Sequence, residues 1–250
     1  GAANTLGAFG EAAISGSHLL LISSEAPIKN RSADGARGIL HEMDDQSALF
    51  TPLAKRVKIG NEDLVLAKSC KTAEDAVATV VEFLKFLSIA PAGVGYIGIP
   101  SDVLNQEFTQ VIPDLSEKAV AYIAQEKNRE IDLDLAKDLL SGVNKIGIWA
   151  GGGATNSSGE IAALADHLSA PIFTSFAGRG VGGLSKNYLN IPIHEIEAEQ
   201  LLADCEALLI FGSQLDGMNT KNWSIKFPKK ILLVDADPKI ALRNISADLV

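Results

Sequence analysis

Residues 145–153, Lys-Ile-Gly-Ile-Trp-Ala-Gly-Gly-Gly, form a short apolar run that ends in three consecutive glycines. Asn144 and Gly151 bound the run, and its length favours a buried strand over a helix. Glycines after a strand let the backbone approach a bound group closely, and the N–H groups that follow can contact a phosphate. The stretch therefore predicts a central strand followed by a ligand loop at Gly151, Gly152 and Gly153.

Strand and helix patterns alternate on both sides of this stretch. Helical spacing of apolar residues predicts helices at 4–13, 133–140, 160–168 and 195–202, and one that begins after Thr72 with Asp75 in a capping box. Short apolar runs predict strands at 18–22, 95–100, 171–174, 207–211 and 231–234. Such alternation is typical of parallel sheets covered by helices. We predict an α/β fold with two parallel-sheet domains, the second a Rossmann-like, doubly wound domain.

The domain organisation follows from a change in composition. Residues 106–131 are poorer in apolar residues than their flanks and richer in Asp, Glu, Gln and Lys, which predicts a linker between domains 1–105 and 132–250. Residues 28–45 have few apolar anchors and predict a long loop, a class of segment that often carries function. The chain begins Gly-Ala-Ala-Asn without Met, so we expect a fragment of a longer protein.

Composition narrows the classes of function. The chain has 250 residues and a net charge of −9, and a nucleic-acid surface needs clustered Lys and Arg instead. Its two cysteines, Cys70 and Cys205, are far apart and predict neither a disulfide framework nor a zinc site, which fits a cytoplasmic setting. No apolar run reaches the length of a membrane span. We expect a protein that binds neither nucleic acid nor membrane.

The glycine loop leaves two interpretations open. It departs from the dinucleotide-binding fingerprint because Asn156 stands where the third glycine belongs. The loop can bind a nucleotide, or it can be a tight strand-to-helix turn without a ligand. Hydrolase and phosphate-loop readings lose their support, since the chain contains no G-x-S-x-G elbow and no G-x-x-x-x-G-K-[ST] loop.

Polar residues follow the last two predicted strands. Gly212 and Ser213 come directly after one strand, and Asp235 and Asp237 after the other. The carboxyl ends of parallel strands share one edge, where ligands bind in open α/β sheets. Asp235 or Asp237 could accept hydrogen bonds from ribose hydroxyls, although an Asp just past a strand is also an ordinary helix cap.

Histidines give one candidate for proton transfer and no metal site. His41 stands beside Glu42 on the long loop and could form an acid/base pair, although such a surface pair is more often merely solvated. The four histidines lack the spacing of metal ligands, so we predict no metal site made from them.

The sequence contains Gly-Ala-Ala-Asn at 1–4, Leu-Ile-Ser-Ser-Glu-Ala-Pro at 21–27 and Gly-Gly-Gly-Ala-Thr-Asn-Ser-Ser at 151–158. Together with residues 170–180 and 231–244, these stretches resemble thiamin-diphosphate enzymes of the acetolactate synthase type. Gly-Ala-Ala-Asn at 1–4 is similar to the end of the family's Gly-Pro-Gly-Ala-Thr/Ala-Asn stretch, and Leu-Ile-Ser-Ser-Glu-Ala-Pro at 21–27 resembles its Ala-Ile-Thr-Gly-Gln-Val-Pro. Residues 145–160, 170–180 and 231–244 are similar to the family's central domain. The resemblance covers nearly the whole chain, in order.

This resemblance implies the C-terminal part of a pyrimidine-binding domain followed by a central domain. Asn4 and His41 would lie near the thiamin pyrimidine, with His41 in place of a Gln, and Lys55 would lie beside the substrate entrance. His can exchange protons near neutral pH and Gln cannot. The family's activating Glu would lie upstream of residue 1. Its Gly-Asp-Gly motif, which holds diphosphate through Mg²⁺, does not occur in this sequence.

The implied function is that of a thiamin-diphosphate-dependent 2-oxoacid decarboxylase or carboligase, acting as a homodimer or homotetramer, with the 250-residue chain inactive alone. FAD binding by the central domain is in question, because Pro91 and residues 189–194 depart from the family's FAD-binding pattern. The glycine loop, Asn156 and Asp235 remain compatible with FAD, ADP or an empty site. Two alternatives stay open: a non-catalytic FAD/ADP-binding or structural module, and an NAD(P)-dependent oxidoreductase.

Overall fold

The computed structural model describes residues 1–32, 34–109, 111 and 133–250. The chain forms two compact units, Gly1–Arg129 and Glu130–Val250, and each is described by itself. Most of the predicted linker lies outside the described residues, so its role stays a prediction.

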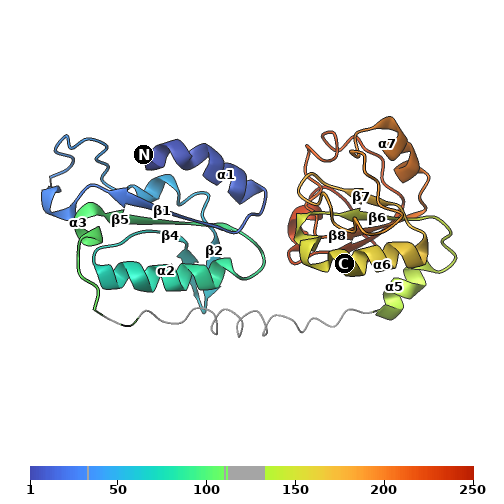
Figure 1. Cartoon of the computed structure of the whole chain (residues 1–250), viewed down its shortest axis with the longest axis horizontal. Coiled ribbons are helices and arrows are strands. Elements are labelled where there is room, and N and C mark those ends of the chain that lie inside the picture. The colour runs from blue at the N-terminus through green and yellow to red at the C-terminus, as the bar shows by residue number, and fades with distance from the viewer. Residues whose placement is uncertain (33, 110, 112–132) are drawn as a thin grey trace. The chain divides into compact units, whose positions relative to one another are not determined.

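The first unit is a parallel three-stranded sheet with helices on both faces (Figure 1). Its strand order is β1-β5-β4. The strands of the unit are β1 (Leu19–Glu25), β2 (Arg56–Ile59), β3 (Glu62–Val65), β4 (Ala67–Ser69) and β5 (Val94–Pro100). Among the described residues of this unit, the α-helices are α1 (Leu6–Ile14), α2 (Ala73–Leu87) and α3 (Ser101–Leu104), and the short 3-10 turns are η1 (Ala2–Thr5), η2 (Ile28–Asn30) and η3 (Ser47–Leu49).

Strand β5 is central and buried along its whole length. Alternation along the strand sends Tyr96 to one face, where it joins Phe9 of α1. It sends Ile97 to the other face, where Phe83 of α2 packs. Helix α2 begins as predicted, since the Thr72 hydroxyl accepts a hydrogen bond from the Asp75 N–H (3.1 Å).

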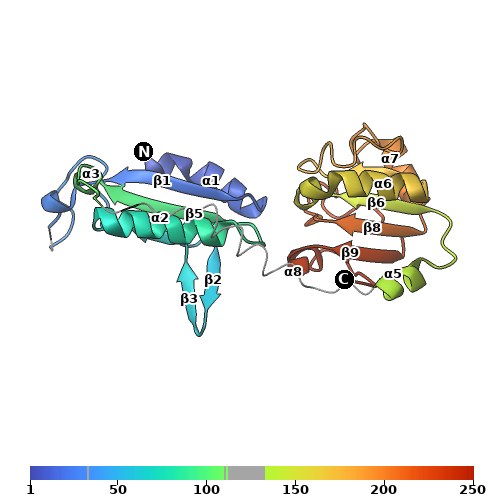
Figure 2. The same cartoon turned by 60° about the horizontal axis from the view of Figure 1, so that its bottom comes forward.

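A two-stranded hairpin projects from the first unit and was not predicted. Strands β2 and β3 pair antiparallel about a turn that contains Gly60, whose φ is +62° (Figure 2). Each strand of the hairpin mixes charged and apolar residues, with Lys58 opposite Asp63, and most positions are exposed. Val57 and Leu64 pack on the core. The weak apolar pattern of the hairpin explains why periodicity did not predict it.

The second unit is a parallel four-stranded sheet in the order β7-β6-β8-β9. Its strands are β6 (Ile146–Ala150), β7 (Ile172–Thr174), β8 (Ala207–Phe211) and β9 (Lys230–Val234). Its helices are α5 (Leu133–Leu140), α6 (Ser158–Leu168), α7 (Ile196–Ala203) and α8 (Pro238–Ala241), and η4 (Gly152–Ser157) is a 3-10 turn. The predicted α/β fold with two parallel sheets is confirmed.

Strand β6 organises the core of this unit, as its apolar run predicted. Ile148 packs with Ile161 of α6 on one face of the sheet. Trp149, fully buried, packs with Leu202 of α7 on the other face. Figure 1 shows α6 and α7 on opposite faces, which is the doubly wound arrangement.

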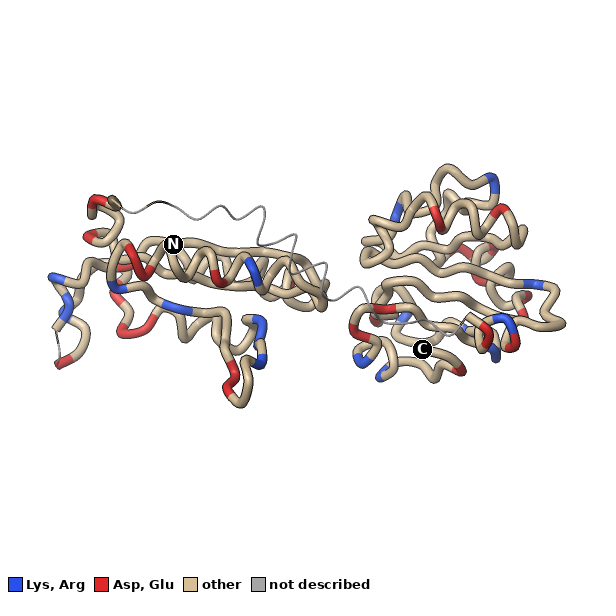
Figure 3. Tube along the Cα trace, turned by 90° about the horizontal axis from the view of Figure 1, so that it is seen from below, with Lys and Arg blue, Asp and Glu red and all other residues tan. Residues whose placement is uncertain are grey.

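Charged residues of both signs occur on each unit (Figure 3). Within the described part of the chain, no helix is long and apolar enough to span a membrane.

Candidate functional site

The carboxyl edge of the four-stranded sheet carries most of the predicted ligand residues. Loops after β6, β8 and β9 all emerge there, because these three strands are neighbours and parallel. The strand order places the chain's change of direction between β6 and β8, which is where open α/β sheets bind ligands.

The loops after β6 and β8 lie in direct backbone contact at this point. The Gly153 N–H donates to the Gly212 carbonyl (3.0 Å), and the Gly151 N–H donates to the Phe211 carbonyl (2.8 Å). A Cβ added to Gly151 would overlap the Gly212 carbonyl oxygen. Gly212 has a φ of +56°, which glycine adopts without strain. The glycines therefore allow two loops to pack together, and these two N–H groups are already paired within the chain.

Three other predicted nucleotide-binding residues, Ser213, Asp235 and Asp237, also have partners within the chain. The buried Ser213 hydroxyl accepts from the Trp149 indole N–H (3.0 Å), so it faces the core. Asp235 accepts from the Asp237 N–H (2.8 Å), and Asp237 caps α8 through the Lys239 N–H (3.3 Å). Exposed Asn156 lies in η4. Ligand binding by these residues stays a prediction.

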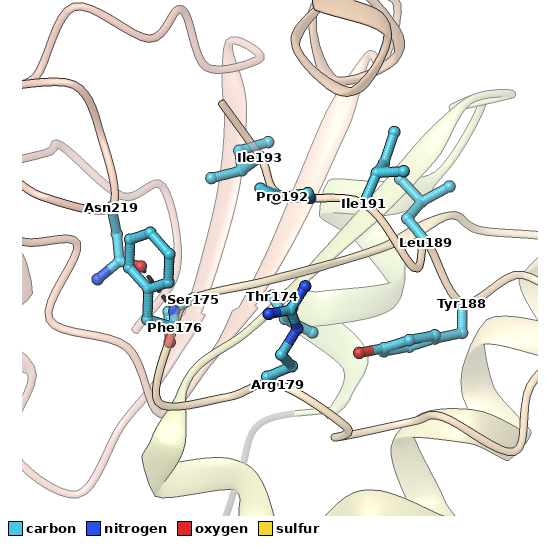
Figure 4. Close-up of a pocket in the computed structure, with 10 residues that line it drawn as sticks. All are labelled: Thr174, Ser175, Phe176, Arg179, Tyr188, Leu189, Ile191, Pro192, Ile193 and Asn219. Atoms are coloured by element: carbon cyan, nitrogen blue, oxygen red, sulfur yellow. Dashed lines mark hydrogen bonds between the residues drawn. The ribbon is translucent and has the colours of Figure 1, made fainter. Parts of the chain in front are cut away.

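Sequence reasoning missed a pocket beside the end of β7 (Figure 4). Phe176 lines it and is 53% exposed, and its N–H donates to the Asn219 side-chain oxygen (2.8 Å). The His194 ring packs edge-on against Phe176, with centroids 5.6 Å apart, and its buried Nε2 has no hydrogen-bond partner among the described residues. Arg179 also lines the pocket, and its planar guanidinium suits a carboxylate or phosphate group. The lining residues are Thr174, Ser175, Phe176, Arg179, Tyr188, Leu189, Ile191, Pro192, Ile193 and Asn219.

The carboxyl edge of the three-stranded sheet holds a buried polar network that the sequence did not reveal. The Glu25 carboxylate pairs with Arg31 (2.9 Å) and accepts from the Ser69 hydroxyl (2.6 Å). The Tyr96 hydroxyl contacts the Ser23 hydroxyl (2.9 Å), and burial raises the pKa of Tyr96. Gln46 donates to the Tyr96 hydroxyl (2.7 Å).

His41 lies on the long loop at this edge, exposed and with a φ of +62°. Its neighbour Glu42 serves the loop backbone, accepting from the N–H groups of Ile39 (3.0 Å), Arg37 (2.8 Å) and Gly38 (2.9 Å). The Ile39 N–H above all, followed by those of Arg37 and Gly38, holds the pKa of Glu42 below its ordinary value against a smaller opposing effect of burial. The Glu42 carboxylate therefore holds the backbone of this loop.

The structure does not bring Lys55 together with His41. The Lys55 ammonium donates to the carbonyls of Phe86 (2.7 Å) and Ile89 (2.7 Å) at the end of α2. Its backbone N–H bonds to Val94, the first residue of β5, so Lys55 lies at the amino edge of the sheet. The Lys55 side chain therefore caps the C-terminal end of α2, at the edge of the sheet opposite the His41 loop.

Asn4 lies in the exposed turn η1, just before α1. Among the residues that the structure describes, no group of His, Cys, Asp and Glu could hold a metal ion. Cys70 and Cys205 are both free and buried, and burial raises the pKa of Cys205 to about 11.

Comparisons with known proteins agree with this architecture. Residues 133–250 match the family described as the thiamine pyrophosphate enzyme central domain. The chain is 30% identical over 249 residues to the probable 2-ketoarginine decarboxylase of Pseudomonas aeruginosa, which covers 96% of the chain and 40% of that protein. Two acetolactate synthase large subunits are also similar. The one from Buchnera aphidicola subsp. Acyrthosiphon pisum is 26% identical over 200 residues, covering 61% of the chain and 35% of that protein.

The second synthase, from Buchnera aphidicola subsp. Schizaphis graminum, is 25% identical over 187 residues, covering 72% of the chain and 33% of that protein. The chain thus spans at most 40% of the length of these curated relatives. Residues 133–250 belong to the thiamine pyrophosphate enzyme family as its central domain, and the chain as a whole is similar to enzymes of this family.

Proposed function

We propose that this chain is part of a thiamin-diphosphate-dependent 2-oxoacid decarboxylase or carboligase. The observation that carries the proposal is a similarity that runs through both units to one such decarboxylase, over 96% of the chain. It is supported by the match of residues 133–250 to the central domain of the same family. The substrate is a 2-oxo acid, and 2-ketoarginine and pyruvate are the first to test.

The carboxyl edge of the three-stranded sheet is the part of this chain that fits the cofactor's pyrimidine. His41 is exposed there on a loop whose backbone is held by Glu42. Its imidazole can donate or accept a hydrogen bond, and exposed Asn4 offers an amide. Bound thiamin diphosphate, with Mg²⁺, would supply the electron sink for decarboxylation. The protein groups orient substrate and cofactor and move protons.

The rest of the proposal concerns assembly and compartment. We infer a homodimer or homotetramer and a cytoplasmic enzyme, the latter because both cysteines are free and buried. Activity then requires more than the 250-residue chain, which we expect to be inactive alone.

A ligand-binding role for the central domain is the second candidate. Phe176 and Arg179 are the exposed groups that such a ligand would contact, while the enclosed space beside them, about 20 Å³, holds only a small part of it. FAD and ADP are the ligands to titrate. The paired glycine loops count against a dinucleotide between β6 and β8, and so against an NAD(P)-dependent oxidoreductase. A hyperbolic titration that Arg179→Met weakens would support the second candidate.

Decarboxylation by the full-length protein tests the main proposal. Release of CO₂ from 2-ketoarginine or pyruvate should require added thiamin diphosphate and Mg²⁺. His41→Ala should lower kcat by about 10²-fold, the usual contribution of a proton-transfer group. His167→Ala, which removes an exposed imidazole from α6, is the matched control and should leave kcat unchanged. Turnover that does not need thiamin diphosphate would refute the proposal.

A further inference from the structure

We propose that Glu25 is a positioning residue that fixes the loop of residues 28–45 and so sets the place of His41. The inference rests on the proposed function for its consequence in catalysis. Its structural part stands on the contacts at the two ends of the loop. In this role Glu25 touches neither substrate nor cofactor.

Glu25 is a charged side chain buried at the point where the loop begins. Its carboxylate side chain is 3% exposed, and its ion pair with Arg31 joins the end of β1 to the first turn of the loop. The Arg31 guanidinium also donates twice to the Ala26 carbonyl (2.9 and 3.2 Å), so its direction is fixed. A buried carboxylate left without its cation is strongly unfavourable, so the loop must stay where Arg31 can reach it.

The far end of the loop is fixed on the same network. The Gln46 amide, buried just past the loop, donates to the Tyr96 hydroxyl (2.7 Å) and to Ser23 (3.1 Å). The Tyr96 hydroxyl lies 3.5 Å from the Glu25 carboxylate. Both ends of the loop therefore close on one buried cluster at the end of β1, with Glu25 as its charged member.

Other polar contacts also keep the loop in place. Asp102 of α3 accepts from the N–H groups of Ile28 (2.9 Å) and Lys29 (3.0 Å), and Glu42 closes the turn before it. Leu40, beside His41, is 81% exposed, so it adds little burial to anchor the apex. A loop held in this way depends on its charged anchors more than a packed segment would.

Gly98 leaves space for the Glu25 carboxylate beside β5. A Cβ at Gly98 would overlap the Glu25 Oε1, so the carboxylate occupies the space that a side chain at this position would fill. Two different variants can therefore disturb the same clamp. Glu25→Gln keeps the shape and removes the charge, and Gly98→Ala keeps the charge and displaces it.

Proteolysis and amide exchange of the 250-residue chain test whether Glu25 fixes the loop, and neither measurement requires enzymatic activity. Trypsin should cleave after Arg37 about tenfold faster in Glu25→Gln than in the wild type, because the loop opens more often. Amide exchange across residues 28–45 should accelerate in parallel. Asp75→Asn is the matched control, since it breaks the Lys68–Asp75 ion pair of the same unit, away from the loop, and should leave cleavage unchanged.

Gly98→Ala should reproduce the effect of Glu25→Gln, provided that circular dichroism shows a folded chain. The two changes combined should add little to either alone, because both release one clamp. Unchanged cleavage and exchange in a folded Glu25→Gln variant would overturn the proposal, whatever Gly98→Ala does.

Kinetics of the full-length enzyme test the consequence for His41. Glu25→Gln should lower kcat at least tenfold in the wild type and have little effect in a His41→Ala background, since the loss passes through the same imidazole. Equal losses in both backgrounds would overturn the positioning role. A full-length enzyme without thiamin-diphosphate-dependent turnover would refute the proposed function instead. The proteolysis result would still show whether Glu25 fixes the loop.

Discussion

Gly151→Ala tests whether the glycine loop exists for loop packing. The added methyl group would overlap the Gly212 carbonyl oxygen and lie 2.6 Å from the Ser213 Cα, and both are backbone atoms that cannot rotate away. The loops after β6 and β8 would have to separate. Separation breaks the bonds from Gly151 to Phe211 and from Gly153 to Gly212.

The expected loss follows from these contacts. Overpacking of a tight site costs about 1–3 kcal/mol, and a buried N–H left unpaired costs a similar amount. We expect Gly151→Ala to lower the free energy of unfolding of the second unit by about 3 kcal/mol. Gly159→Ala is the control, because nothing lies within 4 Å of a Cβ at this exposed position of α6. It should be neutral or stabilising by up to about 1 kcal/mol.

Urea unfolding followed by tryptophan fluorescence measures this difference in the intact chain. The chain has two tryptophans, Trp149 and Trp223, and both belong to the second unit, so the signal reports that unit alone. A Gly151→Ala variant within about 1 kcal/mol of the wild type would refute the packing argument. Such a result would instead support the interpretation that these glycines leave space for a bound ligand.

Three further predictions concern Ser213, Glu42 and Cys205. Ser213→Ala should lower the unfolding free energy by about 1–3 kcal/mol in the same assay, because the buried Trp149 N–H loses its acceptor. The pKa of Glu42 is lowered in the folded chain. Its hydrogen bonds to the loop backbone should therefore persist above pH 4.5 and weaken as the pH falls below 4.5. Amide NMR signals of Gly38 should show this, and a transition near pH 6 would contradict it. Cys205, with a pKa of about 11, should resist iodoacetamide at pH 8 until urea unfolds the chain, as mass spectrometry would detect.

Periodicity predicted strands β8 (Ala207–Phe211) and β5 because their apolar residues are buried in a core. Strand β8 has the bounds that the sequence predicted, and β5 differs by one residue. Helix α5 (Leu133–Leu140) also has the predicted bounds, although none of its residues is buried. The β2–β3 hairpin was missed since a mostly solvated pair of strands leaves little apolar signal.

The candidate site was harder to predict, because sequence shows residue types and not their partners. Gly151 and Ser213 are placed at a ligand edge by topology, yet their polar groups are used within the chain. The resemblance assigned Lys55 to the substrate entrance. In the structure its ammonium donates to carbonyls at the end of α2, and a role beside the substrate stays a prediction. Glu25 could not be recognised, since its cation is nearby in sequence but Ser69 and Tyr96 are brought to it only by the sheet.

The fit of Glu25 against Gly98 also limits the order in which the two positions can change over evolution. A side chain at position 98 displaces the Glu25 carboxylate unless position 25 has first become smaller, because the added Cβ takes the place of the Glu25 Oε1. Relatives with a side chain at position 98 should therefore carry a short residue at position 25, together with a substitution of Arg31, which would otherwise lose its buried partner. The three positions form one inherited unit, and a lineage can leave it only through an intermediate with a loosened loop.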